Sequence, residues 1–223
     1  MFIINDRGPV PDSDLLEMLK KVETATVGHF RHFGFMHPGL RPLAKRPHVV
    51  GPAMTVKTPG ADSTVVHKVM EMVQPGDVVV VDRCGDTLHA CWGGVVTLAA
   101  RLKGVAGAVI DGPATDADEI KEIGLPVYCR GISAITTKLL GLAGEINTAV
   151  QCGGVSVQPG DLILADANGV LVLRPSEAAA VAQEALARQE SEKKLLAGLK
   201  AGKDLPALTR ANSLIAEKGF KKS

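Results

Sequence analysis

The spacing of hydrophobic residues changes twice along the chain, which predicts three stretches of different structure. In residues 1–46, Pro11-Asp12-Ser13 offers a helix N-cap, and leucines follow it at helix spacing. From Pro75 onward, short runs of β-branched and small apolar residues alternate with amphipathic stretches. After Glu145 the apolar runs become shorter and are joined by turns.

The middle stretch predicts parallel βαβ units. Residues 78–81 form a continuous β-branched run, typical of a strand that is buried on both faces. Strand and helix order at this spacing favours right-handed parallel crossovers. Further strands are predicted at 49–56, 106–110 and 126–129, and helices at 63–73, 93–103 and 116–123.

The last stretch predicts short strands and then helices. The Asn168-Gly169 pair is favoured in tight hairpins, and Ser176 begins an Ala-rich charged helix that reaches about residue 199. The short strands are predicted at 150–152, 155–157, 162–165 and 170–173, and a final helix at 206–218. Since no linker divides the chain, we expect one α/β domain over 1–223, with a helical segment at 1–46 and C-terminal helices at 176–223.

One sequence device occurs twice. Pro75-Gly76-Asp77 is followed by four apolar residues and Asp82, and Pro159-Gly160-Asp161 is followed by four apolar residues and Asp166. The flanking residues do not match closely enough for a true repeat, so we interpret the pair as a repeated turn that leads into a strand.

Composition and charge narrow the classes of function. The 25 basic and 24 acidic residues leave a formal charge of +1, without the basic excess of proteins that bind nucleic acid or anionic lipid. We therefore expect neither a nucleic acid nor a membrane as a partner. No segment reaches the ~18 apolar residues of a membrane span, and the early charges argue against a signal peptide. The four cysteines lack CxxC spacing, which favours a cytoplasmic location.

Two junctions between a strand and a helix carry candidate chemistry. In the first, Gly93-Gly94 begins a helix, where successive amides and the helix dipole can hold a carboxylate or phosphate; alternatively, the glycines only permit close packing. In the second, Asp111, Asp116, Asp118 and Glu119 could hold a hard divalent cation with several retained waters. Asp116 and Glu119 could equally form a capping box, which the local sequence alone favours.

Several segments together resemble the family of 4-hydroxy-4-methyl-2-oxoglutarate/4-carboxy-4-hydroxy-2-oxoadipate aldolases and the regulator of ribonuclease activity A (RraA). The resemblance covers nearly the whole chain and implies a three-layer β/β/α sandwich of the swivelling type, assembled as a homotrimer or hexamer. The segments that carry it are 39–43, 50–56, 75–82, 104–112, 153–161 and 165–170, which include Val50-Gly51-Pro52-Ala53-Met54-Thr55-Val56 and Gly104-Val105-Ala106-Gly107-Ala108-Val109-Ile110-Asp111-Gly112.

The resemblance also implies a site. Active family members carry a glycine, twenty residues, Arg-Asp, two further residues and an acid, and here Gly94 is followed at that spacing by Thr115-Asp116 and Glu119. This match implies that Asp116 is the metal ligand, which reverses the preference for capping, and that Glu119 is the trailing catalytic acid. The implied seat of the substrate carboxylate is formed by the amides of Gly93, Gly94, Val95 and Val96. The implied acid from a neighbouring subunit's C-terminal helix is Glu190 or Glu192.

The chain departs from the family pattern at three positions around the implied site. Thr115 stands where the aldolases carry the arginine that grips pyruvate, Gly94 where an acid is common, and His29 where an aspartate is frequent. A replacement cation is therefore expected if the chain is an enzyme. Arg83 is the candidate, and its alternative role is a structural pairing with Asp82 or Asp86.

These observations predict a lyase that depends on a divalent metal, Mg²⁺ or Mn²⁺, and acts on a small pyruvoyl-type oxo-acid. The expected reactions are retro-aldol cleavage of a 4-hydroxy-2-oxo acid and decarboxylation of oxaloacetate, since both leave the same enolate. Neither junction contains a lysine, which disfavours Schiff-base chemistry. The alternatives are an RraA-type regulator that binds a ribonuclease, and a metal enzyme that acts on another sugar-acid or oxo-acid.

Overall fold

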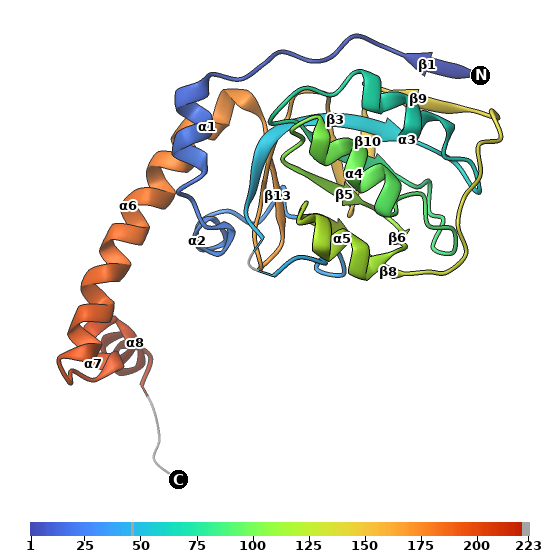
Figure 1. Ribbon diagram of the computed structural model, residues 1–223. Coiled ribbons are helices and arrows are strands. Elements are labelled where there is room, and N and C mark those ends of the chain that lie inside the picture. Colours follow the sequence, from blue (N-terminus) through green and yellow to red (C-terminus); the bar gives the residue numbers. More distant parts are fainter. Residues whose placement is uncertain (46, 220–223) are drawn as a thin grey trace.

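The computed structural model describes residues 1–45 and 47–219. Its centre is a parallel sheet in the order β3-β4-β5-β7, which confirms the predicted βαβ units. These strands are β3 (Val49–Lys57), β4 (Val78–Asp82), β5 (Gly107–Ile110) and β7 (Val127–Cys129). The helices α3 (Thr64–Lys68), α4 (Gly94–Leu102) and α5 (Ala117–Ile123) cover one face of the sheet (Figure 1).

The β-branched run of β4 is buried on both sides, as its composition predicts. Val79 and Val81 belong to the core beneath the helices, whereas Val78 and Val80 belong to a second core on the opposite face. This alternation follows from the two-residue period of a strand.

A second β layer covers that opposite face. β3 bends from one layer into the other: residues 49–52 pair antiparallel with β12 (Leu162–Ala165), and residues 53–57 pair parallel with β4. β12 forms the predicted hairpin with β13 (Val170–Leu173) across the Asn168-Gly169 turn. A further predicted hairpin joins β10 (Val150–Cys152) and β11 (Val155–Val157).

Terminal helices complete the sandwich beyond the β12–β13 hairpin. They are α1 (Ser13–Leu19), α2 (Thr24–Gly28) and α6 (Pro175–Lys200), and a third core lies between them and the leucines of the hairpin. The layers, together with structural neighbours of the same fold reported below, confirm the β/β/α sandwich with helical terminal segments.

The short edge elements were not predicted from the sequence. They are β1 (Phe2–Ile4), β2 (Arg41–Pro42), β6 (Pro113–Ala114), β8 (Gly131–Ile132) and β9 (Gly144–Ile146). The prediction of one helix over 206–218 is wrong: the chain forms α7 (Leu205–Leu208) and α8 (Ala211–Lys218), because Thr209 between them has an extended backbone. Residue 46 and residues 220–223, the ends of the predicted terminal segments, lie outside the described residues.

The repeated Pro-Gly-Asp device forms the same local structure twice. Asp77 accepts a 2.7 Å hydrogen bond from the amide of Gln74, and Asp161 accepts one of the same length from the amide of Gln158. Each nearly buried aspartate also pairs with an arginine, Arg7 for Asp77 and Arg174 for Asp161. The two turns are therefore equivalent starts of β4 and β12.

The C-terminal half of α6 leaves the body of the molecule. The helix has 26 residues and is about 39 Å long, yet its last buried residue is Ala185. Residues 186–219, called the C-terminal arm below, carry α7 and α8 and extend beyond the sandwich, with Gln189 near their start still hydrogen-bonded to Lys21 and Glu23 (Figure 1). Among the described residues, no helix combines the length and the apolar composition needed to cross a membrane.

Candidate functional site

The first candidate junction meets the second one at a pair of glycines. The amide of Gly94 donates a 3.0 Å hydrogen bond to Asp116 Oδ2. A Cβ atom on Gly93 would lie 2.5 Å from the same oxygen and 2.8 Å from Thr115 Cγ2, and a Cβ atom on Gly94 would overlap the Glu119 carboxylate. The glycine pair thus allows two carboxylates to lie directly against the start of α4.

Asp116 is in an uncommon backbone conformation. Its φ and ψ are 51° and 46°, the left-handed region that residues other than glycine rarely adopt. It occupies the N-cap position of α5, but its side chain makes no cap hydrogen bond, so the capping box that local sequence favours does not form. Its carboxylate instead faces α4, with Oδ1 lying 3.2 Å from the hydroxyl of Thr115.

A buried tryptophan fixes the loop that brings these residues together. Trp92 Nε1 donates to the hydroxyl of Thr97 at 2.9 Å, and this hydroxyl donates to the carbonyl of Gly93 at 2.8 Å. The amide of Thr115 donates to the carbonyl of Trp92 at 2.9 Å. The start of α4 and the loop before α5 are therefore held in one rigid arrangement.

The amides at the start of α4 are available to an anion. The first amides of a helix have no intrahelical partner, and in α4 they belong to Gly94, Val95 and Val96. Asp116 uses the amide of Gly94, which leaves those of Val95 and Val96. Val95 is exposed, so a ligand can approach from solvent.

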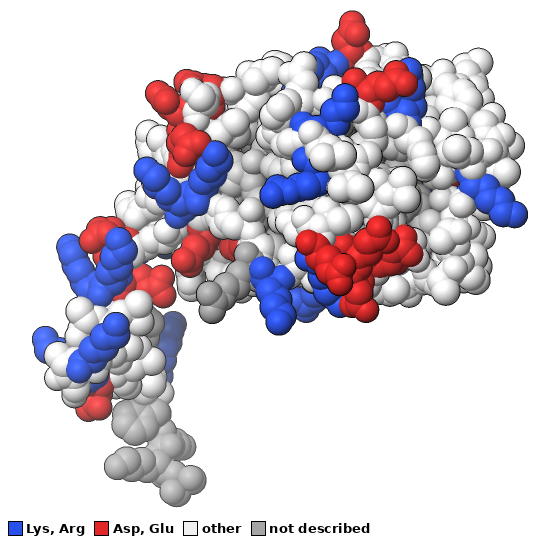
Figure 2. All heavy atoms as spheres, in the orientation of Figure 1, with Lys and Arg blue, Asp and Glu red and all other residues white. Residues whose placement is uncertain are grey.

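The predicted cluster of four carboxylates separates into three places. Only Asp116 and Glu119 approach the glycine pair. Asp111 pairs with Arg130, and the exposed Asp118 pairs with Lys121. Among residues 1–45 and 47–219, no group of three or more His, Cys, Asp or Glu residues is arranged to hold a metal ion. Figure 2 shows the acidic side chains gathered over α5.

The structure does not bring Arg83 into this site. Its guanidinium is fully buried and donates to the carbonyls of Thr58 and His89 at 3.1 and 3.2 Å, and also to that of Gly60. It lies 3.5 Å from Asp86 Oδ2, which corresponds to the structural alternative. A bidentate contact with substrate would require these bonds to break.

Glu190 and Glu192 lie far along α6 on the C-terminal arm, and both are exposed. Glu190 pairs with Lys193 at 2.8 Å. Glu192 lines a cavity of about 350 Å³ between α2 and α6, together with His29 and Arg188. Neither acid joins Asp116 within the chain, so a contribution to a neighbouring subunit stays a prediction.

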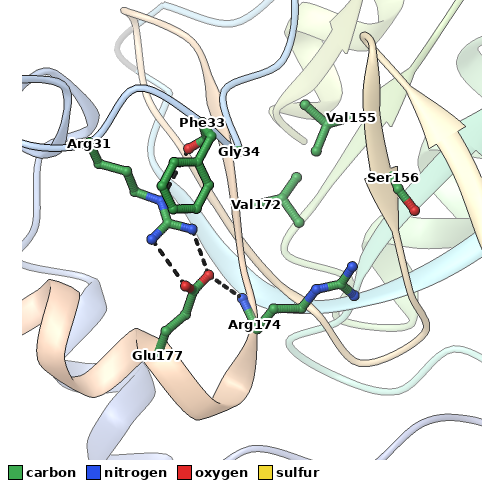
Figure 3. Close-up of a pocket in the computed structure, with 8 residues that line it drawn as sticks. All are labelled: Arg31, Phe33, Gly34, Val155, Ser156, Val172, Arg174 and Glu177. Atoms are coloured by element: carbon green, nitrogen blue, oxygen red, sulfur yellow. Dashed lines mark hydrogen bonds and ion pairs between the residues drawn. The ribbon is translucent and has the colours of Figure 1, made fainter.

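A further cavity of about 220 Å³ lies at the root of α6 (Figure 3). Both of its arginines are already paired: Arg31 binds Glu177 through two nitrogens, and Arg174 binds Asp161. Its charges therefore anchor α6 to the body of the molecule.

Sequence reasoning missed Arg130. It is the first residue after β7, as Asp111 is after β5, and the two side chains form an ion pair at the carboxyl edge of the sheet. Ligands of parallel sheets bind at this edge, so the position of Arg130 after a predicted strand was the available signal.

The model of the RraA-like family (Aldolase/RraA) matches residues 13–172. The chain belongs to the RraA-like family. A relative from Halalkalibacterium halodurans named "Putative 4-hydroxy-4-methyl-2-oxoglutarate aldolase" is 39% identical over 153 residues, which are 69% of this chain and 72% of the relative.

Solved structures of this family have the same fold. A Streptomyces coelicolor protein, described as an unusual member of the RNase ES inhibitor RraA protein family, superposes with a TM-score of 0.75 and 31% identity, covering 83% of this chain and 97% of its own. The RNA-processing inhibitor RraA from Thermus thermophilis superposes with a TM-score of 0.59 and 26% identity, covering 75% and 94%. The family model ends before α6, so the C-terminal arm lies outside the matched region.

Proposed function

We propose that this RraA-like protein is a lyase that requires a divalent cation and cleaves a carbon–carbon bond in a pyruvoyl-type oxo-acid. The observation that carries the proposal is the position of Asp116, whose carboxylate turns away from its own helix and lies against the glycine pair of α4. The name of the relative from Halalkalibacterium halodurans supports the same class of reaction.

The residues at the glycine pair suit Mg²⁺ or Mn²⁺. Mg²⁺ is commonly bound through one or two carboxylates, with waters and substrate oxygens completing its coordination, so a cage of three protein ligands is not needed. Asp116 would hold the cation, and Glu119 lies beside the same glycines. When bound, the cation supplies Lewis-acid stabilisation of the electron pair that carbon–carbon cleavage leaves behind.

The chain's own groups then bind and orient the substrate. The free amides of Val95 and Val96 would donate to the substrate carboxylate, assisted by the positive end of the helix dipole. Glu119 is placed to accept or return a proton beside Asp116.

Cysteine catalysis is disfavoured, because burial raises the pKa of all four thiols, in Cys91 to about 11. Only the deprotonated thiolate is an effective nucleophile, and these thiols stay protonated at neutral pH.

The test is release of pyruvate from oxaloacetate by the full chain with Mg²⁺, with Mn²⁺ and with a chelator. Asp116→Asn is the decisive variant, because Asn can still accept from the amide of Gly94 but carries no charge for the cation. We expect chelation to abolish turnover and Asp116→Asn to lower kcat/KM at least 100-fold. Full Mg²⁺-stimulated turnover in this variant would show that the metal assignment is wrong.

The second candidate is an RraA-type regulator that binds a ribonuclease. It is favoured by the two RraA neighbours and by Thr115, which cannot neutralise a substrate carboxylate as the aldolase arginine does. Absence of both turnover and Mg²⁺ binding would support this function. Turnover of another sugar-acid or oxo-acid, but not of oxaloacetate, would support the third reading, a metal enzyme with a different substrate.

We further propose that the chain assembles as a homotrimer or hexamer. Large apolar side chains are exposed on α4 and on the segment 131–142, next to the candidate site: Val95, Leu98, Leu102, Ile132, Ile135, Leu139, Leu140 and Leu142. Exposed apolar surface of this kind marks interfaces between proteins. Light scattering should return a multiple of three subunits, and a monomer would contradict the shared site to which Glu190 or Glu192 contributes.

A further inference from the structure

The proposed function leaves unused a cavity beside the site. It has a volume of about 370 Å³ and is lined by Thr87, Pro113, Arg130, Gly131 and Ile132. At ~30 Å³ per water molecule, this volume equals that of about twelve waters, enough for a small organic group. Arg130 is the one charged residue among the described residues that line the cavity, and it is paired with Asp111 through Nε alone.

The arginine is held in place and still has donors to offer. Its Nε donates to Asp111 Oδ1 at 2.5 Å, and the other oxygen of Asp111 accepts from the amide of Gly153 at 2.9 Å. Within the described residues, neither terminal nitrogen of Arg130 has a hydrogen-bond partner. A guanidinium oriented in this way can present two parallel N–H groups to a carboxylate.

The cavity lies next to the glycine-pair site along the chain. Pro113 lines the cavity, and Thr115, two residues later, contacts Asp116 and faces Gly93. Two residues of extended chain span at most about 7 Å, so the backbone positions of Pro113 and Thr115, which border the two places, lie within that distance of each other. β6 pairs with β8 in parallel, which fixes the loop that carries Gly131 and Ile132 against the strand that leads to Thr115.

We propose that Arg130 binds the second carboxylate of a dicarboxylic 2-oxo acid whose first carboxylate and ketone occupy the site at Gly93, Gly94 and Asp116. This inference rests on the proposed function and assigns the residue that recognises the distal group of its substrate. Arg130 would thus bring a cation to the distal end of the substrate, whereas the pyruvoyl end at Thr115 keeps only the amides of α4.

The test compares two ligands of equal length that differ only in the distal group. 2-Oxoglutarate carries a terminal carboxylate and 2-oxovalerate a methyl group, and neither has the 4-hydroxyl group that retro-aldol cleavage needs. With Mg²⁺ present, calorimetric titration of the full chain should give a Kd for 2-oxoglutarate at least tenfold lower than that for 2-oxovalerate. Arg130→Gln should remove this difference and leave the Kd for 2-oxovalerate unchanged within twofold.

Two further variants guard against a loss of folding in Arg130→Gln. Thr87→Glu places a negative charge at the exposed rim of the cavity and leaves the ion pair between Arg130 and Asp111 intact, so it should weaken the binding of 2-oxoglutarate alone. Arg174→Gln is the matched control, since it breaks an equivalent arginine–aspartate pair at the root of α6 and should change neither Kd.

The outcomes separate this inference from the proposed function. Equal affinity of the unmodified chain for both acids would overturn the inference and leave the proposed function intact. Equal weakening of the binding of both acids by Arg130→Gln and by Thr87→Glu would also overturn it. Failure of the unmodified chain to bind either acid would contradict the proposed function and the inference together.

Discussion

Gly93→Ala tests most directly whether the close approach of Asp116 to α4 matters for function. Gly93 has φ −140° and ψ −164°, an extended conformation that alanine adopts without strain. The only consequence of the added methyl group is therefore steric. It would lie 2.5 Å from Asp116 Oδ2 and 2.8 Å from Thr115 Cγ2, so both side chains must retreat, the carboxylate by about 1 Å, to reach ordinary contact distances.

The expected cost falls on activity more than on folding. A displacement of about 1 Å at a reacting centre can lower turnover roughly 100-fold, which corresponds to about 2.7 kcal/mol of activation free energy. Overpacking costs about 1–3 kcal/mol of stability, and the exposed side of the site allows Asp116 to move at the lower end of that range. We expect a folded protein with oxaloacetate turnover reduced about 100-fold and with weaker Mg²⁺ affinity.

The assay is pyruvate release with saturating Mg²⁺, with urea unfolding of each variant alongside. Gly28→Ala is the matched control, because a Cβ atom there meets only Phe35 at an ordinary 3.9 Å and should leave turnover unchanged. If Gly93→Ala keeps full turnover and Mg²⁺ affinity in a folded protein, the contact between Asp116 and the glycine pair has no functional role.

Three further predictions follow from buried charges and from the proposed cation. Arg83→Lys should lower the free energy of unfolding by about 3 kcal/mol in urea titrations, because one ammonium group cannot replace a buried guanidinium that is bonded to three carbonyls. Unchanged stability together with weaker substrate binding would show instead that Arg83 binds the substrate. Asp62 is buried, which tends to raise its pKa, but hydrogen bonds from Thr64, Leu142 and Leu140 lower the pKa well below its usual value. The ionised Asp62 therefore stabilises the fold above about pH 4, and this stabilisation is lost as the pH falls below that value. In Asp62→Asn, the free energy of unfolding should fall less steeply as the pH is lowered below about 4. An equally steep fall in the variant would contradict this prediction. Mg²⁺ at 100 times its Kd should raise the free energy of unfolding by about 2.7 kcal/mol, and Asp116→Asn should abolish this rise; an equal rise in the variant would place the cation elsewhere.

Strands and helices with a clear apolar pattern were predicted correctly, down to the three-residue strands β10 and β11. The alternation of β4 places Val79 and Val81 under the helices and Val78 and Val80 under the second β layer, and such a run has few alternative interpretations. β6 and β8 have two residues each and exist only because they pair with each other, so the local sequence contains no period that could indicate them.

The same alternation could have predicted the position of Arg83. Counting from Val79 and Val81, the next odd position after β4 is directed to the face that the helices cover, and Arg83 is buried there. Because Arg83 directly follows a strand, the sequence correctly predicts that it lies at the carboxyl edge of the sheet. The direction of its side chain follows only from the two-residue period of that strand.

The role of Asp116 could not be decided from its neighbours in sequence. Ser, Thr, Asp and Asn are common at N-caps, and Glu119 stands where a capping box requires it. The capping hydrogen bond fails to form because the left-handed backbone of Asp116 turns its carboxylate toward an amide 22 residues earlier in the chain. Only the tertiary contact with α4 distinguishes a cap from a ligand.

The replacement of the family arginine by Thr115 changes the charge balance of the site. Asp116 and Glu119 lie against the same two glycines, and neither forms an ion pair with a lysine or arginine among the described residues. Two adjacent carboxylates repel each other, and each favours a neighbouring cation. Thr115 has no charge with which to offset these carboxylates, so we expect a bound cation or a neighbouring subunit to supply the compensation under the proposed function. Under the proposed function, Thr115 in place of the arginine would make the site more dependent on a divalent cation, and the amides of α4 together with Arg130 would bind the carboxylates of the substrate.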